Sequence, residues 1–381
     1  MTSRLPTTFK RFSSTITVKP TPSKSHLHNP IPCNSFPEGY ILSGIHAGIK
    51  KNASALDLAV ILSTSPRPTS AAACFTRNAF KAAPVLVSEQ VLENNGGRAR
   101  AIVVNSGCAN AVTGKKGLEN AWKMARATDE LLEMVSDTFS QEPSFGSTSG
   151  SETLVMSTGV IGQHVPIDSI LSALASFRYA ESTTPFSSSF TAWENAAKAF
   201  MTTDTFPKLR ARSFQIGMQT YRIAGMDKGA GMIHPNMRPA KTSRFSSPNS
   251  GGDGVMHATL LGCVLTDAPV SPRSLQSALT YAVDRSFNSI SVDGEMSTND
   301  TIIALANGAG VEWDAPEIDE ATDKESYRLF RDELTAFTQD LAQLVVRDGE
   351  GATKFVKITV KVRFPFSFFL GMSGEMTRYS H

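Results

Sequence analysis

Three short segments place threonine hydroxyls beside glycine or other small residues, and a hydroxyl is an oxygen nucleophile that acyl-transfer chemistry can use. The segments are Ser157-Thr158-Gly159, Met201-Thr202-Thr203-Asp204-Thr205 and His257-Ala258-Thr259-Leu260-Leu261. A serine or threonine hydroxyl is a weak nucleophile unless a base beside it accepts its proton. The sequence shows neither a G-x-S-x-G nucleophile elbow nor a serine–histidine–aspartate arrangement, so the base must come from elsewhere.

Cleavage of the chain before a threonine would supply that base. The new α-amine has a pKa of about 7.7–8.0, so a useful fraction is unprotonated near neutral pH. The amine and the hydroxyl then belong to one residue, and the amine can take the proton as the hydroxyl attacks. Composition alone favours a capped turn or a strand position for each of these threonines, so the two interpretations stay open at this point.

A nucleotide or metal site is not indicated. Lys228 precedes Gly229-Ala230-Gly231, whereas a phosphate-binding loop needs its lysine after the glycines and a helix beginning there. His234 stands alone before a proline, and the histidine spacings of zinc sites are absent. The sequence therefore predicts no metal and no bound cofactor.

The elements that must position these residues follow from hydrophobic patterns and from glycine and proline. Strands are predicted over 40–45, 56–62, 101–107, 155–162, 287–292 and 301–306, with a hairpin over 213–225. Helices are predicted over 117–135, 167–177, 190–200, 272–286 and 324–346, and loops over 136–151 and 293–300. Strands and helices are mixed without strict alternation, which predicts an α/β fold other than a simple Rossmann winding.

The composition is that of a folded domain, with 41% hydrophobic and 19% charged residues. No stretch reaches the roughly 18 apolar residues of a membrane-spanning helix. The formal charge is +2, and the basic excess lies at the start of the chain, so no nucleic-acid partner is indicated. The cysteines are widely spaced without a C-x-x-C pair, which argues against a zinc ribbon or a disulfide framework: Cys33, Cys74, Cys108 and Cys263.

Residues 1–37 differ from the rest. They contain five lysines and arginines, many serines and threonines, and no acidic residue. This composition, without the apolar run of a secretory signal, is typical of a mitochondrial transit peptide. A disordered basic tail without an address is the alternative.

Several longer motifs, in this order, resemble the ornithine acetyltransferase (glutamate N-acetyltransferase) family of arginine biosynthesis. They are VNSGCANAVTG at 104–114, MSTGVIG at 156–162, MTTDTFPK at 201–208, KGAGMIHPNM at 228–237, ATLLG at 258–262, SFNSISVDGEMSTNDT at 286–301 and RDGEGATKF at 347–355. The resemblance covers about residues 39–360. It implies a layered α-β-β-α sandwich and an enzyme that cleaves itself before a threonine.

By this resemblance, the cleaved bond joins Ala258 and Thr259, and Thr259 is also the residue that accepts the acetyl group. The resemblance assigns the oxyanion hole to the Thr158 hydroxyl and the Gly159 amide. Pre-aimed donors of this kind stabilise the charge that develops on an acyl oxygen. Thr202, Lys228, Thr259 and Glu350 match substrate-binding positions. Asn110 is a weaker candidate for the wall of the site, and turn formation explains this asparagine equally well or better.

The resemblance also implies substrates and partners. The acetyl group would move from N-acetylornithine, and in many members from acetyl-CoA, to glutamate. The products of cleavage would be an α chain over 38–258 and a β chain over 259–361, joined as a heterodimer or heterotetramer in the mitochondrial matrix.

Two departures from the family pattern leave other interpretations open. Residues 238–257 form a Ser/Pro/Gly/Arg-rich insertion before the cleavage motif. Residues 362–381, with four phenylalanines over 364–369, do not match the family's C-terminal continuation and are predicted to be an aberrant tail. The alternatives are therefore a hydrolase or aminopeptidase with the same N-terminal threonine, or an inactive truncated remnant.

Overall fold

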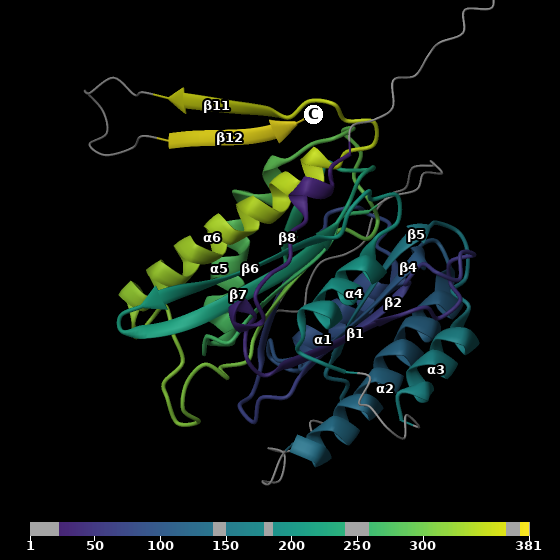
Figure 1. The fold of residues 1–381 in the computed structure, drawn as a ribbon, viewed down its shortest axis with the longest axis horizontal. Coiled ribbons are helices and arrows are strands. Elements are labelled where there is room, and N and C mark those ends of the chain that lie inside the picture. The colour runs from purple at the N-terminus through teal and green to yellow at the C-terminus, as the bar shows by residue number, and fades with distance from the viewer. Residues whose placement is uncertain (1–22, 140–149, 179–185, 241–258, 363–373, 381) are drawn as a thin grey trace, which may run out of the picture.

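The computed structural model shows an α/β fold built on two large sheets, with helices on their outer faces (Figure 1). The structure describes residues 23–139, 150–178, 186–240, 259–362 and 374–380. Ala258 and most of the 238–257 insertion lie outside these ranges, as does the phenylalanine run over 364–369.

The first sheet has four strands, in the order β1 (Tyr40–Ile45), β2 (Leu58–Ser63), β4 (Ala101–Cys108) and β5 (Thr153–Val160). The first three pair antiparallel, whereas β4 and β5 are parallel. A parallel pair needs a crossover, and α2 (Gly114–Phe139) lies in that connection. The carboxyl ends of β4 and β5 therefore lie at the same edge of the sheet.

Helices cover this first sheet. α2 packs on β4 and β5, and α3 (Ile167–Ser176) packs on α2. α1 (Ala83–Asn94) contacts β5, where the Ser88 hydroxyl donates to Val155 O and accepts from Val155 N, each at 2.8 Å. These two bonds satisfy backbone groups of a strand at the sheet edge.

The second sheet has six strands, in the order β6 (Lys208–Ile216), β7 (Gln219–Lys228), β9 (Leu261–Thr266), β10 (Thr301–Ala306), β3 (Ser70–Thr76) and β8 (Met237–Pro239). Only β9 and β10 pair in parallel, so these two strands begin at the same edge. β7 is antiparallel to β9 and ends where β9 begins. α5 (Pro272–Asp284) and α6 (Lys324–Arg347) pack on each other and against this sheet.

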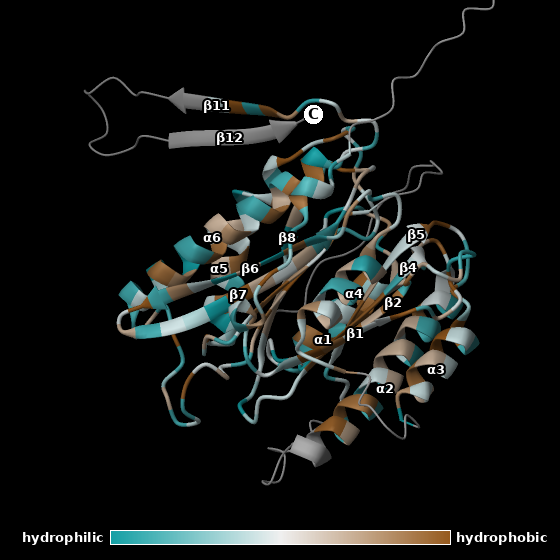
Figure 2. Cartoon of the chain, in the orientation of Figure 1, coloured by the Kyte–Doolittle hydropathy of each residue, from teal (hydrophilic) through white to brown (hydrophobic). Residues whose placement is uncertain are grey.

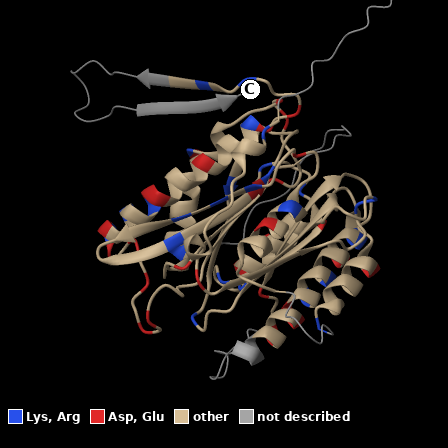
Figure 3. Ribbon diagram, in the orientation of Figure 1, with Lys and Arg blue, Asp and Glu red and all other residues tan. Residues whose placement is uncertain are grey.

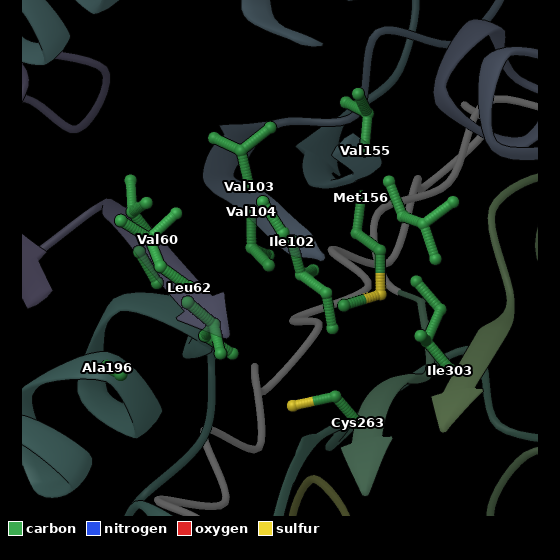
Figure 4. Packing of buried hydrophobic residues seen from close by; sticks show 14 of the residues in the cluster. Val60, Leu62, Ile102, Val103, Val104, Val155, Met156, Ala196, Cys263 and Ile303 are labelled. Atoms are coloured by element: carbon green, nitrogen blue, oxygen red, sulfur yellow. The ribbon is translucent and has the colours of Figure 1, made fainter. Parts of the chain in front are cut away.

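One part of the core lies between the two sheets, and a second buried cluster lies between the second sheet and the helices α5 and α6. Ile102 and Met156 of the first sheet point toward Cys263 and Ile303 of the second, and these four residues belong to one buried cluster (Figure 4). Figure 2 shows that the strands of the first sheet are largely hydrophobic, while α6 alternates hydrophobic and hydrophilic residues. α4 (Phe190–Phe200) contacts β1 and β2 of one sheet and β6 and β7 of the other. The predicted layered α-β-β-α arrangement is confirmed.

Most predicted elements are present, and their bounds differ by a few residues. The predicted strand over 287–292 is wrong, because the chain forms a 3-10 turn, η3 (Phe287–Ser289). Phe287 and Ile290 are both buried, and residues three apart share one face of a 3-10 turn. Of the loop predicted over 136–151, residues 136–139 belong to α2 instead, and residues 140–149 lie outside the described residues.

Other elements had no predicted counterpart: α1, β3, β8, β9, the short 3-10 turns η1 (Ser25–Leu27) and η2 (Cys33–Ser35), and a final hairpin. In that hairpin β11 (Val356–Val362) pairs antiparallel with β12 (Gly374–Ser380), so one strand lies within the segment 362–381. Among the described helices, none is both long and apolar enough to cross a bilayer. Figure 3 shows acidic and basic residues interspersed over the described part of the molecule.

Candidate active site

The ends of three strands of the second sheet bring the motifs together. Lys228, the last residue of β7, pairs with Leu261 at the start of β9, and Leu261 pairs with Thr301 at the start of β10. Thr259 therefore lies at this edge, two residues before β9. The polar run over 297–300 lies beside it, just before β10. β5 of the facing sheet brings Thr158 to the same place.

Thr259 is buried, with 1% of its surface exposed. Hydrogen bonds fix both its hydroxyl and its carbonyl group. Its Oγ1 lies 2.7 Å from Ser297 Oγ. Its carbonyl oxygen accepts a hydrogen bond from Lys228 Nζ at 2.7 Å. The next amide, Leu260 N, donates to Asp300 Oδ1 at 3.0 Å. The hydroxyl is thus fixed in position before any substrate arrives.

Lys228 joins the two sheets at this point. Besides Thr259, its Nζ donates to Thr158 Oγ1 at 3.4 Å. Burial lowers the pKa of Lys228, and the nearby Asp204 carboxylate opposes that effect. Since Thr158 Oγ1 accepts from Lys228, its own O–H remains able to donate to another oxygen.

Gly159 can only be glycine in this backbone. Its φ is +121°, and an added Cβ would lie 2.3 Å from the carbonyl carbon of Gly107 on β4. A side chain there would push β5 away from β4. The glycine therefore keeps the end of β5, with Thr158, against its neighbour.

The second group of predicted residues lies around Glu350. Glu350 N donates to Ala230 O at 2.7 Å, and its Oε1 accepts from the Thr203 hydroxyl at 2.6 Å. The Thr202 hydroxyl is buried and has no hydrogen-bond partner among the described residues. An unpartnered buried hydroxyl costs free energy unless a ligand or water satisfies it.

A buried ion network connects the two groups. Lys208 Nζ binds Asp204 Oδ1 and also Asp348 Oδ2, the latter at 2.8 Å. Asp204 accepts from Thr202 N and from Gly229 N, each at 2.9 Å. One carboxylate therefore ties the Thr202 loop to the residue after Lys228, and Asp348 ties the segment that carries Glu350 to the same lysine.

Asn110 has a local role. Its φ is +49°, its Nδ2 donates to Gly117 O at 2.9 Å, and its Oδ1 accepts from Thr113 Oγ1 at 2.8 Å. Both ends of the amide are used within its own loop, as the turn explanation expects.

Sequence reasoning missed the polar run before β10. Ser297 contacts the Thr259 hydroxyl, and Asp300 accepts from Leu260 N and from Ser297 N. Asn299 Nδ2 donates to Ala109 O and Ser157 O, at 2.7 and 2.9 Å, and so binds the first sheet. The sequence feature that could have identified this part of the site is a run of four polar residues, 297–300, directly before a buried apolar strand. No group of three acidic, histidine or cysteine side chains among the described residues could hold a metal ion.

The fold and the site define an α/β sandwich with a buried threonine hydroxyl between its sheets, and comparison with known proteins gives its family. The ArgJ family model matches residues 41–363. The arginine biosynthesis bifunctional protein ArgJ, mitochondrial, of Postia placenta is 63% identical over 360 residues, covering 94% of this chain and 73% of that protein. The protein of the same name from Laccaria bicolor is 65% identical over 352 residues, covering 92% of this chain and 70% of that protein.

Among solved structures, ornithine acetyltransferase from Mycobacterium tuberculosis, complexed with ornithine, is 32% identical with a TM-score of 0.40, covering 54% of this chain and 95% of that one. The chain belongs to the ArgJ family. The predicted family and enzyme class, an acetyltransferase of arginine biosynthesis, are confirmed, and the hydrolase alternative is not favoured. The relatives are named as mitochondrial proteins, which supports the predicted mitochondrial location.

Proposed function

We propose that this chain cleaves its Ala258–Thr259 bond and then carries an acetyl group on Thr259, moving it from N-acetylornithine, or from acetyl-CoA, to glutamate. The observation that carries the proposal is that Lys228 Nζ donates hydrogen bonds to both Thr158 Oγ1 and Thr259 O. These two hydrogen bonds support the proposal because one lysine links Thr259, the proposed nucleophile, to Thr158, the proposed oxyanion donor.

In the cleavage step, the Thr259 hydroxyl attacks the carbonyl carbon of Ala258. The peptide C–N bond breaks, an ester to Thr259 Oγ1 forms, and the hydroxyl proton ends on the new amine. Water then hydrolyses the ester, leaving a carboxylate on Ala258 and a free hydroxyl on Thr259. The Thr158 hydroxyl and the Gly159 amide would stabilise the tetrahedral oxyanion.

Acetyl transfer repeats the same chemistry in two halves. The Thr259 amine accepts the hydroxyl proton as Oγ1 attacks the acetyl carbonyl, and ornithine leaves with that proton on its amine. The amine of glutamate then attacks the acetyl ester and regenerates the hydroxyl. Where Lys228 is charged, its ammonium would lower the pKa of the neighbouring Thr259 amine and favour the neutral base.

The substrate-binding role falls to Thr202, Lys228 and Glu350. The Glu350 side chain is exposed and suits the α-ammonium group of an amino acid. The buried Thr202 hydroxyl lacks a partner in the part of the chain that the structure describes, so a substrate oxygen or nitrogen there would satisfy it.

The products of cleavage would be an α chain over 38–258 and a β chain over 259–361, associated as a heterodimer or heterotetramer. The site of action would be the mitochondrial matrix, reached through the leader over 1–37.

The test is to incubate the purified protein with N-acetylornithine alone and measure the mass of the peptide that begins at Thr259. We expect one acetyl group on that peptide, removed when glutamate is added, with N-acetylglutamate formed. Release of acetate at the same rate with and without glutamate would instead identify a hydrolase.

A further inference from the structure

We propose that Ser297 is a further catalytic residue, whose hydroxyl donates a hydrogen bond to the Thr259 nucleophile in both self-cleavage and acetyl transfer. This inference rests on the proposed function of Thr259. Ser297 Oγ and Thr259 Oγ1 are 2.7 Å apart, and both side chains are buried. A contact of this length is typical of an O–H···O hydrogen bond.

The other contacts of Ser297 are compatible with its hydroxyl donating to Thr259. Ser297 Oγ accepts a hydrogen bond from Asn299 N at 3.0 Å. The single proton of the Ser297 hydroxyl then needs an acceptor. Among the described residues, the acceptor within hydrogen-bond distance is Thr259 Oγ1. A serine hydroxyl has one donor and two acceptor sites. The contact allows either hydroxyl to donate, and the proposal takes Ser297 as donor because that direction leaves the Thr259 proton for the base.

This direction matters for the reaction. With a lone pair of Thr259 Oγ1 held by Ser297, the Thr259 proton points away from Ser297 and can pass to the amine. As Oγ1 loses that proton, the bond from Ser297 becomes charge-assisted and stronger. Ser297 keeps its own proton throughout, so no additional acid or base is needed. The same bond stabilises Oγ1 when it is the leaving group.

The position of Ser297 is set by Asp300, which also binds the segment that carries Thr259, and by Thr76 at the end of β3. Asp300 accepts from Ser297 N at 3.2 Å with one oxygen and from Leu260 N at 3.0 Å with the other. Thr76 Oγ1 donates to Ser297 O at 2.7 Å. The buried Asp300 carboxyl thus bridges Leu260, which follows Thr259, and Ser297. Such a bridge fixes the distance between the two hydroxyls.

The test compares Ser297→Ala with Ser286→Ala in the full chain. Ser286 is also a fully buried serine, and its hydroxyl donates to Ala282 O at 2.7 Å. We expect Ser297→Ala to slow self-cleavage and to lower kcat for acetyl transfer by roughly 100-fold, as when one pre-aimed donor is removed. KM for N-acetylornithine should change by less than about threefold, because the bond strengthens mainly in the transition state. Ser286→Ala should cleave and transfer like the unaltered chain.

Ser297→Cys is measured alongside, because it nearly keeps the side-chain volume and replaces a good donor by a weak one. It should also lose at least about tenfold in kcat, and it carries the comparison if Ser297→Ala does not fold. Unchanged cleavage and kcat in the folded variant, or a loss confined to KM, would overturn the role of Ser297. An unaltered chain that cuts itself but transfers no acetyl group contradicts the proposed transfer alone, and cleavage rates still test Ser297.

Discussion

Lys228 donates to one atom from each sheet, Thr158 Oγ1 and Thr259 O, although these residues are far apart in the sequence. A buried ammonium needs such acceptors, because burial without them would strongly disfavour its charge. The lysine therefore serves structure and chemistry at once. It fixes the carbonyl of Thr259, the proposed nucleophile, and leaves the Thr158 proton free for the proposed role in an oxyanion hole.

Replacing Thr158 by alanine tests that arrangement. The predicted result is a loss of roughly 10- to 1,000-fold in kcat with little change in substrate binding, because the donor acts mainly in the transition state. Thr158→Ser keeps the hydroxyl and should retain most of the turnover. Steady-state kinetics on both variants measure this, and a Thr158→Ala enzyme with normal turnover would leave Thr158 a purely structural role.

The titration of the Asp300 carboxyl should appear in the pH dependence of the protein's stability. Burial raises the pKa of Asp300 from its ordinary 3.8 to about 7. Between these values the folded chain keeps a proton that the unfolded chain has lost, so stability falls as pH rises from about 4 to about 7, and then levels. Asp300→Asn lacks this titration. Thermal midpoints of both proteins should therefore be measured between about pH 4 and pH 7. As pH rises, the midpoint of the unaltered chain should fall relative to that of Asp300→Asn. Parallel curves would contradict the assignment.

At the scale of elements, the Lys208 network connects the loop before β6 with the end of α6. Although burial opposes its charge, the carboxylates of Asp204 and Asp348 hold the pKa of Lys208 above its ordinary value. Lys208→Ala leaves buried carboxylates without their counter-ion. It should lower the free energy of unfolding by about 3–5 kcal/mol.

The matched control is Lys198→Ala, which removes a partly exposed lysine paired with Glu194 on α4. An exposed pair of this kind contributes less than about 1 kcal/mol. Denaturant titrations of both variants give the comparison, and equal losses would show that the Lys208 network does not stabilise the fold.

Elements with a strong periodic pattern could be predicted from the sequence, and those without one could not. α6 and α4 have regular apolar spacing, and the hairpin of β6 and β7 surrounds a clear turn. β3 reads Ser-Ala-Ala-Ala-Cys-Phe-Thr; its only β-branched residue is Thr76, and three of its seven residues are alanines, which are depleted in strands. It is a strand because β10 and β8 pair with it on either side, and that context is invisible in a local window.

The candidate site was likewise predictable in part. Thr158, Lys228 and Thr259 were found through motifs, and in the structure Lys228 donates a hydrogen bond to each of the two threonines. Ser297 is separated from Thr259 by 38 positions. Its contact with Thr259 depends on the parallel pairing of β9 and β10, which no spacing rule in the sequence reveals.

At the scale of the whole molecule, the proposed cut falls between β8 and β9, yet both products share one sheet. β9 and β10 lie between β7 and β3, so strands of the C-terminal product pair on both sides with the N-terminal product. The inter-sheet core also includes residues from both. We expect the two pieces to elute together from a sizing column in native buffer and to separate only in denaturant. Separate native elution would contradict the proposal that the cleaved chains stay associated.

The most direct test of the central claim is the mass and N-terminal residue of the fragments from the unaltered chain and from Thr259→Ala. The unaltered protein should give two bands on a denaturing gel, the smaller beginning at Thr259. Thr259→Ala should remain one uncut band, and Thr259→Ser should still cut because its hydroxyl can perform the same acyl shift. Cleavage at the same bond in Thr259→Ala would contradict the assignment of Thr259 as the nucleophile.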